Sequence, residues 1–166
     1  MRAEGSRARR EFTRFVKFCV VGTIGFVVDA GTLFLLSNLL GLWTLASQFL
    51  SFWAAVTSNF LWNRHWVYPD SRTKPVRSQV AQFVLVNVAG IVLIRTPFFA
   101  LAEKPLQRLA ASLLPSLQTW PAPVPTWASR FSPADLGTML TLVMAVIIVL
   151  FWNFAANRLW TYSDVS

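Results

Sequence analysis

Charged residues, cysteine and histidine are all scarce in this chain of 166 residues. Only 13% of its residues are charged, against roughly 25% in soluble globular domains. One cysteine excludes an intrachain disulfide, and one histidine with no cysteine or carboxylate cluster argues against a bound metal or other cofactor. Apolar residues make up 55% of the chain. The composition therefore predicts a membrane protein.

Four apolar runs are long enough to cross a bilayer, which takes about 20 residues of helix for roughly 30 Å of hydrocarbon. Lipid offers the backbone no hydrogen-bond partners, so each run is expected to be a helix. The runs cover residues 15–36, 42–62, 80–102 and 136–156. They predict an all-α integral membrane protein with four transmembrane helices.

Basic residues between the runs predict which side of the membrane each connection occupies. Eleven lysines and arginines lie in the two termini, at the mouth of the first run and between the second and third runs, against three before the fourth run. The positive-inside rule then places both termini in the cytoplasm. The net charge of +8 is explained by this arrangement, and nucleic-acid binding is not expected.

The two halves of the chain end in the same motif. Residues 59–68 read NFLWNRHWVY and residues 153–162 read NFAANRLWTY, so six of ten positions are identical. Each half is predicted to be a hairpin of two spans, and an even number of spans gives both repeats one orientation. The expected organisation is a basic tail 1–13, a repeat 14–68, a cytoplasmic linker 69–79, a second repeat 80–162 and a tail 163–166.

The second repeat contains a long proline-rich connection, residues 103–135, predicted to lie on the outer side. Its first part, 106–114, can form an amphipathic interfacial helix, whereas 120–127 resists helix formation because three prolines interrupt it. The connection is either a stiff surface connector or a lid over a site.

The repeated ending has the chemistry of a phosphate-binding site. Amide and guanidinium groups share one helix face near the cytoplasmic boundary, where a lipid headgroup lies, and arginine binds phosphate through two hydrogen bonds. Tryptophans beside them can stack on a sugar. The candidate residues are Asn59, Asn63, Arg64 and Trp66 in the first copy and Asn153, Asn157, Arg158 and Trp160 in the second. Helix capping and an ordinary interfacial aromatic belt are the structural alternative.

Polar residues also occur at membrane depth. Asp29 lies inside the first span, where an ionised carboxylate costs about 3 kcal/mol, and Arg95 lies at a similar depth in the third span. An ion pair between them offsets that cost, and it either fixes the helix register, forms a site for an anionic headgroup or leaves Asp29 as a proton-coupled switch. Pro97 is expected to kink the third span. No catalytic set of residues is present, so an enzyme is not expected.

These residues resemble the GtrA-like family of small four-span bacterial membrane proteins. The likeness rests on Arg14-Phe15, Val21-Gly22, Asp29 and both copies of the repeated ending. Two departures distinguish the halves, because Asn87 stands where the first half has Gly22 and Arg95 replaces a second acid. The resemblance implies a multi-pass protein of the bacterial inner membrane that handles a polyprenyl-phosphate-linked sugar for cell-surface polysaccharide.

Three functions follow as hypotheses. The first is a flippase for the sugar-lipid, in which a homo-oligomer forms the path because four helices are too few to enclose a sugar. The second is a scaffold that holds a membrane glycosyltransferase at its polyprenyl-phosphate substrate. The third is a proton-coupled exporter of small cations that uses Asp29.

Overall fold

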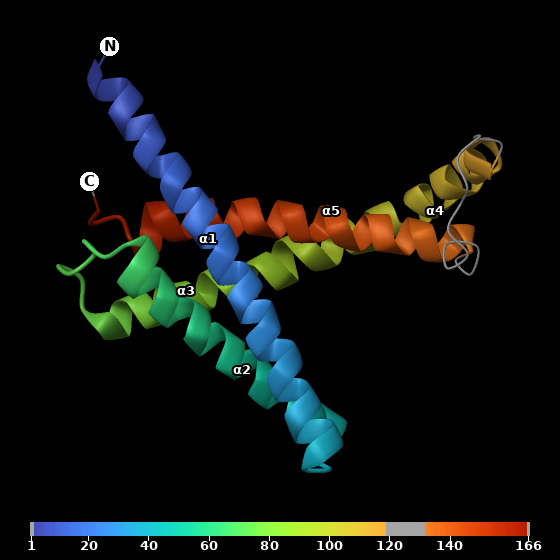
Figure 1. Ribbon diagram of the computed structural model, residues 1–166, viewed down its shortest axis with the longest axis horizontal. Helices are drawn as coiled ribbons and strands as arrows, with labels where there is room; N and C mark the ends of the chain where they lie inside the picture. Colours follow the sequence, from blue (N-terminus) through green and yellow to red (C-terminus); the bar gives the residue numbers. More distant parts are fainter. Residues whose placement is uncertain (1, 119–131, 166) are drawn as a thin grey trace. The chain divides into compact units, whose positions relative to one another are not determined.

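The computed structural model describes residues 2–118 and 132–165, and all regular structure in these ranges is helical, as predicted (Figure 1). Short segments of π-helix, in which the backbone turn is wider than in an α-helix, follow or interrupt the α-helices. In chain order the elements are α1 (Arg2–Phe34), η1 (Leu35–Leu39), α2 (Thr44–Trp62), η2 (Asn63–Val67), α3 (Val76–Ala89), η3 (Gly90–Arg95), α4 (Thr96–Gln118), α5 (Pro133–Ala156) and η5 (Asn157–Thr161).

Three helical stretches in the described ranges are long and apolar enough to cross a membrane. They are Ala8–Leu39, Val76–Leu113 and Pro133–Thr161, and they contain the predicted spans 15–36, 80–102 and 136–156. The remaining predicted span, 42–62, coincides with α2, a helix of 19 residues. Serine, threonine and asparagine side chains make α2 more polar than the other three, and its crossing stays a prediction.

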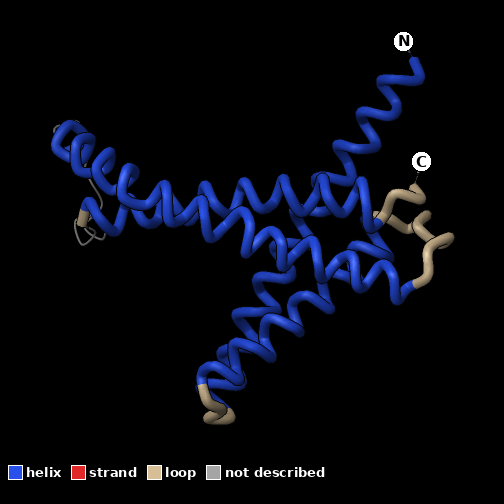
Figure 2. Tube along the Cα trace, turned by 180° about the vertical axis from the view of Figure 1, so that it is seen from behind, coloured by secondary structure: helices blue, strands red, loops and turns tan. Residues whose placement is uncertain are grey.

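The helices form two compact units, Met1–Leu85 with Phe154–Ser166, and Val86–Asn153. In the first unit α1 and α2 lie side by side as a hairpin (Figures 1 and 2). Gly41 closes the hairpin with φ 64°, a left-handed conformation that suits glycine. Gly25 lets the two helices approach closely, because a Cβ there would lie 2.2 Å from Oδ1 of Asn59.

In the second unit, the continuous helix formed by the end of α3 from Val86 on, by η3 and by α4 runs beside α5 (Figures 1 and 2). A Cβ on Gly90 would lie 3.1 Å from Oδ1 of Asn153, so a glycine again faces the asparagine that opens the repeated ending. Farther along the same pair of helices, a Cβ on Gly137 would lie 2.3 Å from Cα of Gln107. Small residues set the helix separation at both places, as expected for helices that pack in lipid.

The expected kink at Pro97 takes the form of a π-helical segment. η3 ends at Arg95, and the next residue, Thr96, donates its N–H to the carbonyl of Ile91, five residues earlier. Its hydroxyl donates to the same carbonyl at 2.9 Å. Proline lacks an N–H and clashes with the carbonyl four residues before it, and a wider turn just before Pro97 relieves that crowding.

In the described residues, much of the predicted connection 103–135 is helical, and its place on the outer side stays a prediction. α4 continues past Pro105 to Gln118, and it includes the expected interfacial helix 106–114. Contacts with α5 hold this part in helical form despite the proline, because Gln107 donates to Thr138 at 3.0 Å. α5 begins at Pro133, a residue whose missing N–H costs nothing at the first helical position. The stretch 120–127 and its two tryptophans lie outside the described residues.

The close approach at Gly137 gives a stability test. We expect Gly137→Ala to lower the free energy of unfolding in detergent by about 1–3 kcal/mol, since backbone atoms of Gln107 must move to admit a methyl group. Gly31→Ala is the matched control, because nothing lies within 4 Å of its added Cβ. Thermal unfolding of the two purified variants checks this, and equal midpoints would contradict the described packing.

Candidate functional site

The two copies of the repeated ending adopt the same backbone structure. Each contains a π-helical segment of five residues, η2 in the first copy and η5 in the second. Tyr68 donates its N–H to the carbonyl of Asn63, and Tyr162 donates to Asn157, both at 2.8 Å. The identical residues of the repeat therefore stand at equivalent places in one local fold, and π-helical turns are frequent at functional sites.

Two of the predicted amides face inward. Asn63 and Asn157 are almost completely buried. Asn63 donates its side-chain amide to the carbonyl of Asn59 at 2.8 Å, and Thr161 donates its hydroxyl to Oδ1 of Asn157 at 2.9 Å. These bonds support the wide turns. Neither amide is a surface group that meets a ligand directly in this conformation.

A stacked pair of tyrosines joins the two endings inside the first unit. The rings of Tyr68 and Tyr162 have centroids 4.4 Å apart and planes inclined by 16°, and both side chains are fully buried. Burial raises the pKa of both hydroxyls above the ordinary range. The tyrosines therefore stay neutral at physiological pH and act as packing groups.

Lysine side chains bind the end of each copy in the same manner. Lys17 donates to the carbonyl of Trp66 at 3.3 Å and lies 5.5 Å from the centroid of its ring. Lys74 donates to the carbonyl of Trp160. A cation at a helix C-terminus satisfies carbonyls that lack helical partners and is favoured by the helix dipole. Trp66 and Trp160 themselves remain partly exposed, so both can contact lipid or a sugar.

The two predicted arginines differ in their partners. Arg158 makes a bidentate ion pair with Glu11, with Nε 3.1 Å from one carboxylate oxygen and Nη2 3.2 Å from the other. Arg14 also donates to Glu11, at 2.6 Å. By contrast, Nη1 of Arg64 is buried and has no hydrogen-bond partner within the described residues. An internal carboxylate thus pairs with the arginine of the second copy, and in the part of the chain that the structure describes no carboxylate pairs with Arg64.

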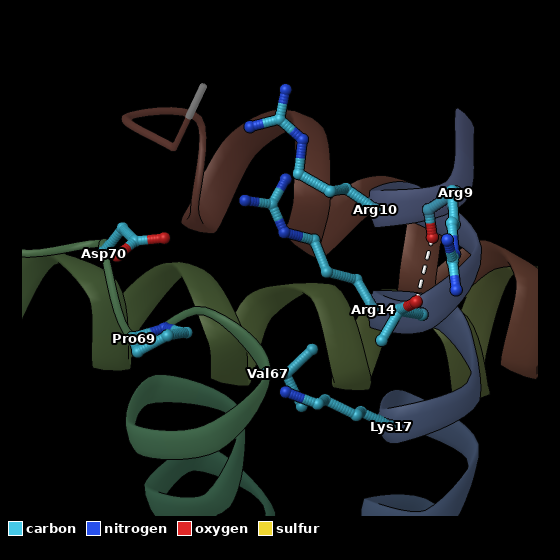
Figure 3. Close-up of a pocket in the computed structure, with 8 residues that line it drawn as sticks. Arg9, Arg10, Arg14, Lys17, Val67, Pro69 and Asp70 are labelled. Carbon is cyan, nitrogen blue, oxygen red and sulfur yellow. Dashed lines mark hydrogen bonds between the residues drawn. The ribbon is translucent and has the colours of Figure 1, made fainter. Parts of the chain in front are cut away.

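A pocket of about 560 Å³ lies in the first unit between the start of α1 and the segment after η2 (Figure 3). The guanidinium groups of Arg10 and Arg14 extend from α1 toward the side where Asp70 lies, as Figure 3 shows. Its lining comprises Arg9, Arg10, Thr13, Arg14, Lys17, Val67, Pro69 and Asp70. Four cations and one carboxylate line the pocket, and Arg14 also pairs with Glu11 outside the lining. Positive charge remains in excess, so the pocket suits an anion that brings two or more oxygen acceptors.

Sequence reasoning missed this pocket because it assigned the basic stretch to a cytoplasmic tail near anionic lipid and did not identify it as a binding site. α1 begins at Arg2, so the stretch is helical and continuous with the first span. One signal was present, since Arg10, Arg14 and Lys17 recur at the spacing of a single helix face. The second signal, the approach of Pro69 and Asp70, depends on tertiary structure and has no counterpart in the local sequence.

The predicted residues at membrane depth belong to different units. Asp29 is half-buried in α1 and makes no described hydrogen bond or ion pair within the first unit. Asn87 is half-buried in α3, and Arg95 is exposed at the end of η3, both in the second unit. The ion pair of Asp29 with Arg95 stays a prediction.

The residues after each ending form a polar clasp that sequence reasoning did not anticipate. Asp164 accepts hydrogen bonds from the hydroxyl of Ser71 at 2.5 Å and from the N–H and hydroxyl of Thr73 at 3.2 and 2.8 Å. Gln79 donates to Ser71 at 2.6 Å. Burial opposes ionisation of Asp164, but these hydrogen bonds outweigh it and lower the pKa of the carboxyl. The clasp fixes the loop between α2 and α3 to the end of the chain.

Comparison with known proteins shows which family this chain is similar to. The sequence profile described as GtrA/DPMS, transmembrane domain, matches residues 17–162. This range starts inside α1 and ends at Tyr162, so it includes both copies of the repeated ending.

Two relatives support the match. An uncharacterized membrane protein, YngA, from Bacillus subtilis is 26% identical over 150 residues, which cover 89% of this chain and 78% of YngA. A dolichol-phosphate mannosyltransferase from Pyrococcus furiosus is 29% identical over 104 residues, which cover 63% of this chain and only 29% of that protein. Most of the mannosyltransferase lies outside the similarity.

The clasp predicts a pH dependence. Because the folded-state pKa of Asp164 is lowered, its contribution to stability is complete above the unfolded value near 3.9 and is lost as the pH falls through the folded value. We expect Asp164→Asn to lower the free energy of unfolding by about 1 kcal/mol at pH 7 and to flatten the pH profile below pH 4. Limited proteolysis of the loop 69–75 at several pH values measures this. Equal cleavage of variant and parent at pH 7 would rule the clasp out.

Proposed function

The chain belongs to the GtrA/DPMS transmembrane-domain family, and from this premise we propose that it binds a polyprenyl-phosphate-linked sugar and moves the headgroup across the membrane. The family and the mannosyltransferase relative connect this type of domain with sugars handled on polyprenyl phosphates. A bacterial membrane protein is similar to this chain over most of its length, and this similarity favours the cytoplasmic membrane as the location of the protein. The proposal assigns no bond-making or bond-breaking step to the chain.

The observation that carries the proposal is the cationic pocket of the first unit. Its arginines lie in the N-terminal half of α1 just before the apolar run that begins at residue 15, and Lys17 lies at the mouth of that run. A phosphate headgroup lies at this depth when the prenyl chain is in the hydrocarbon region. Guanidinium groups bind phosphate oxygens through short charge-assisted hydrogen bonds, which are about twice as strong as neutral ones.

Arg64 is the second cation that favours phosphate binding at this end of the first unit. Its guanidinium has a buried, unpartnered nitrogen, whereas a phosphate at Arg158 must displace the carboxylate of Glu11. We therefore assign the first copy of the ending to phosphate binding and the second to structural support. Asn59, Asn63 and Asn157 shape the turns that hold these arginines, and Trp66 and Trp160 offer exposed rings for a sugar to stack on.

Translocation takes the polar headgroup past the residues at membrane depth. Asp29, Asn87 and Arg95 are the polar groups available on that route. The prenyl chain stays in lipid throughout, so only the sugar and phosphate need a polar path. A chain of this size cannot enclose a sugar by itself, and we propose that a homo-oligomer completes the path.

The phosphate pocket is tested by paired charge removal. We expect Arg10→Gln combined with Arg14→Gln to weaken polyprenyl phosphate binding at least tenfold, because each lost charge-assisted hydrogen bond is worth about 1.5–3 kcal/mol. Native mass spectrometry of the protein in nanodiscs measures binding, and a vesicle assay measures transport of the sugar-lipid.

Arg72→Gln with Arg77→Gln is the matched control, because both residues are exposed and line none of the described pockets. It removes the same charge and should leave binding and transport intact. Arg64→Ala should reduce both measurements, and Arg158→Ala should act mainly on stability through loss of its pair with Glu11. Transport at the parental rate in the Arg10/Arg14 variant would contradict the proposal.

A scaffold for a membrane glycosyltransferase is the second candidate, and the partial match to the mannosyltransferase favours it. The similar region makes up less than a third of that enzyme, so a comparable transmembrane part serves a larger catalytic protein there. A separate chain could supply the same part to a partner enzyme. This function needs the phosphate pocket and does not need Asp29.

Asp29→Asn separates the two candidates. We expect it to slow transport at least fivefold while polyprenyl phosphate binding stays unchanged, because Asp29 lies 15 residues along α1 from Arg14. A variant with full activity in cells that still recovers a glycosyltransferase in pulldown would favour the scaffold instead. Arg14→Gln, which touches the pocket, serves as the comparison that should fail in both assays.

A further inference from the structure

A second basic pocket, of about 520 Å³, lies in the second unit where α4 meets the start of α5. Lys104, Arg108 and Ala111 line it from α4 and occupy one helix face, since they are spaced by four and three residues. Gln107 and residues 132–134 complete the lining. No sequence motif pointed to this place.

The helix that carries the two cations is held rigidly. Gly137 of α5 lies so close to the backbone of Gln107 that no Cβ fits between them. Gln107 donates to the hydroxyl of Thr138 at 3.0 Å, and that hydroxyl donates to Glu103 at 3.2 Å. Lys104 and Arg108 flank Gln107 in sequence, so this network fixes the backbone on which both cations stand.

The carboxylates at this end of the second unit are already engaged. Glu103 accepts from Thr138, and Asp135 accepts from the N–H and hydroxyl of Ser132 at 2.9 and 2.7 Å in a helix cap. Within the second unit, neither Lys104 nor Arg108 makes a described ion pair. In the described part of this unit, the pocket therefore presents two cations that have no ion-pair partner and can meet an anion from outside the chain.

The surroundings of the pocket match a lipid surface. Leu101, Leu109 and Leu113 of α4 are exposed beside the cations, with Leu101 77% exposed, the pattern of a helix that lies at the boundary between lipid and water. The helical stretch Val76–Leu113 is long and apolar enough to cross a membrane, and Lys104 and Arg108 stand near its C-terminal end. The positive-inside prediction places the N-terminal end of this stretch in the cytoplasm and so assigns Lys104 and Arg108 to the outer face.

We propose that Lys104 and Arg108 bind the phosphate of a lipid headgroup at the outer membrane surface. The proposal rests on the proposed function in one respect, because it makes this pocket the place that receives the headgroup after it crosses. Two lipids offer the same phosphate chemistry, a polyprenyl phosphate and an anionic phospholipid such as phosphatidylglycerol. The test uses both.

The experiment places a photo-crosslinking amino acid at Ala111, which lines this pocket, and a second one at Asp70, which lines the pocket of the first unit. Full-length protein is reconstituted in phosphatidylcholine nanodiscs that contain undecaprenyl phosphate, phosphatidylglycerol or neither. Mass spectrometry counts the crosslinked lipid. We expect Lys104→Gln with Arg108→Gln to reduce the adduct at position 111 at least fivefold, and Arg72→Gln with Arg77→Gln to leave it unchanged.

The outcomes separate this site from the proposed function. Adducts with both phosphate lipids support a general headgroup site, and adducts with undecaprenyl phosphate alone support one specific for the translocated lipid. The inference is overturned if the Lys104/Arg108 substitution leaves the adduct at position 111 unchanged. It is also overturned if the adduct forms equally with phosphatidylcholine alone. The adduct at position 70 reports on the other pocket independently, so either site can fail while the other stands.

Discussion

The stack of two buried tyrosine rings holds together the end of the first unit, because each ring comes from a different half of the repeated sequence. Tyr68 and Tyr162 follow directly after the two π-helical turns, and hydrogen bonds from neighbouring segments lie on both sides of them. Lysines bind the carbonyls before each ring, and the clasp at Asp164 joins the segments after them.

The same symmetry makes the difference between the two arginines informative. The backbone around Arg64 and Arg158 is equivalent, so their different partners come from side chains that the repeat does not share. Glu11 neutralises Arg158, and position 76, which corresponds to Glu11 when the beginnings of the two halves are aligned, is a valine. A duplicated structure thus contains one arginine with an internal carboxylate and one without. This difference is the basis for our proposal that the second copy supports the fold and the first copy binds a ligand.

Hydrophobic run length predicted the helices well, because lipid requires closed backbone hydrogen bonding and the runs are long. Helix ends were harder to place. Proline signals in α4 favoured a loop, but packing against α5 at Gln107 and Gly137 outweighed the loss of one backbone bond at Pro105. This packing between α4 and α5 cannot be predicted from the local sequence around Pro105.

The candidate site could be predicted by composition but not by geometry. The motif coincides with a π-helical turn that the sequence analysis did not predict. A pattern of four-residue spacing cannot say whether Asn63 faces lipid or the protein interior, and the π-helical turn rotates the residues that follow it. The sequence showed the charges of the pocket but could not show that they form a site. Pro69 and Asp70 come close to Arg10 and Arg14 only through the fold of the first unit. Residues far apart in the chain decide which charges are left for a ligand.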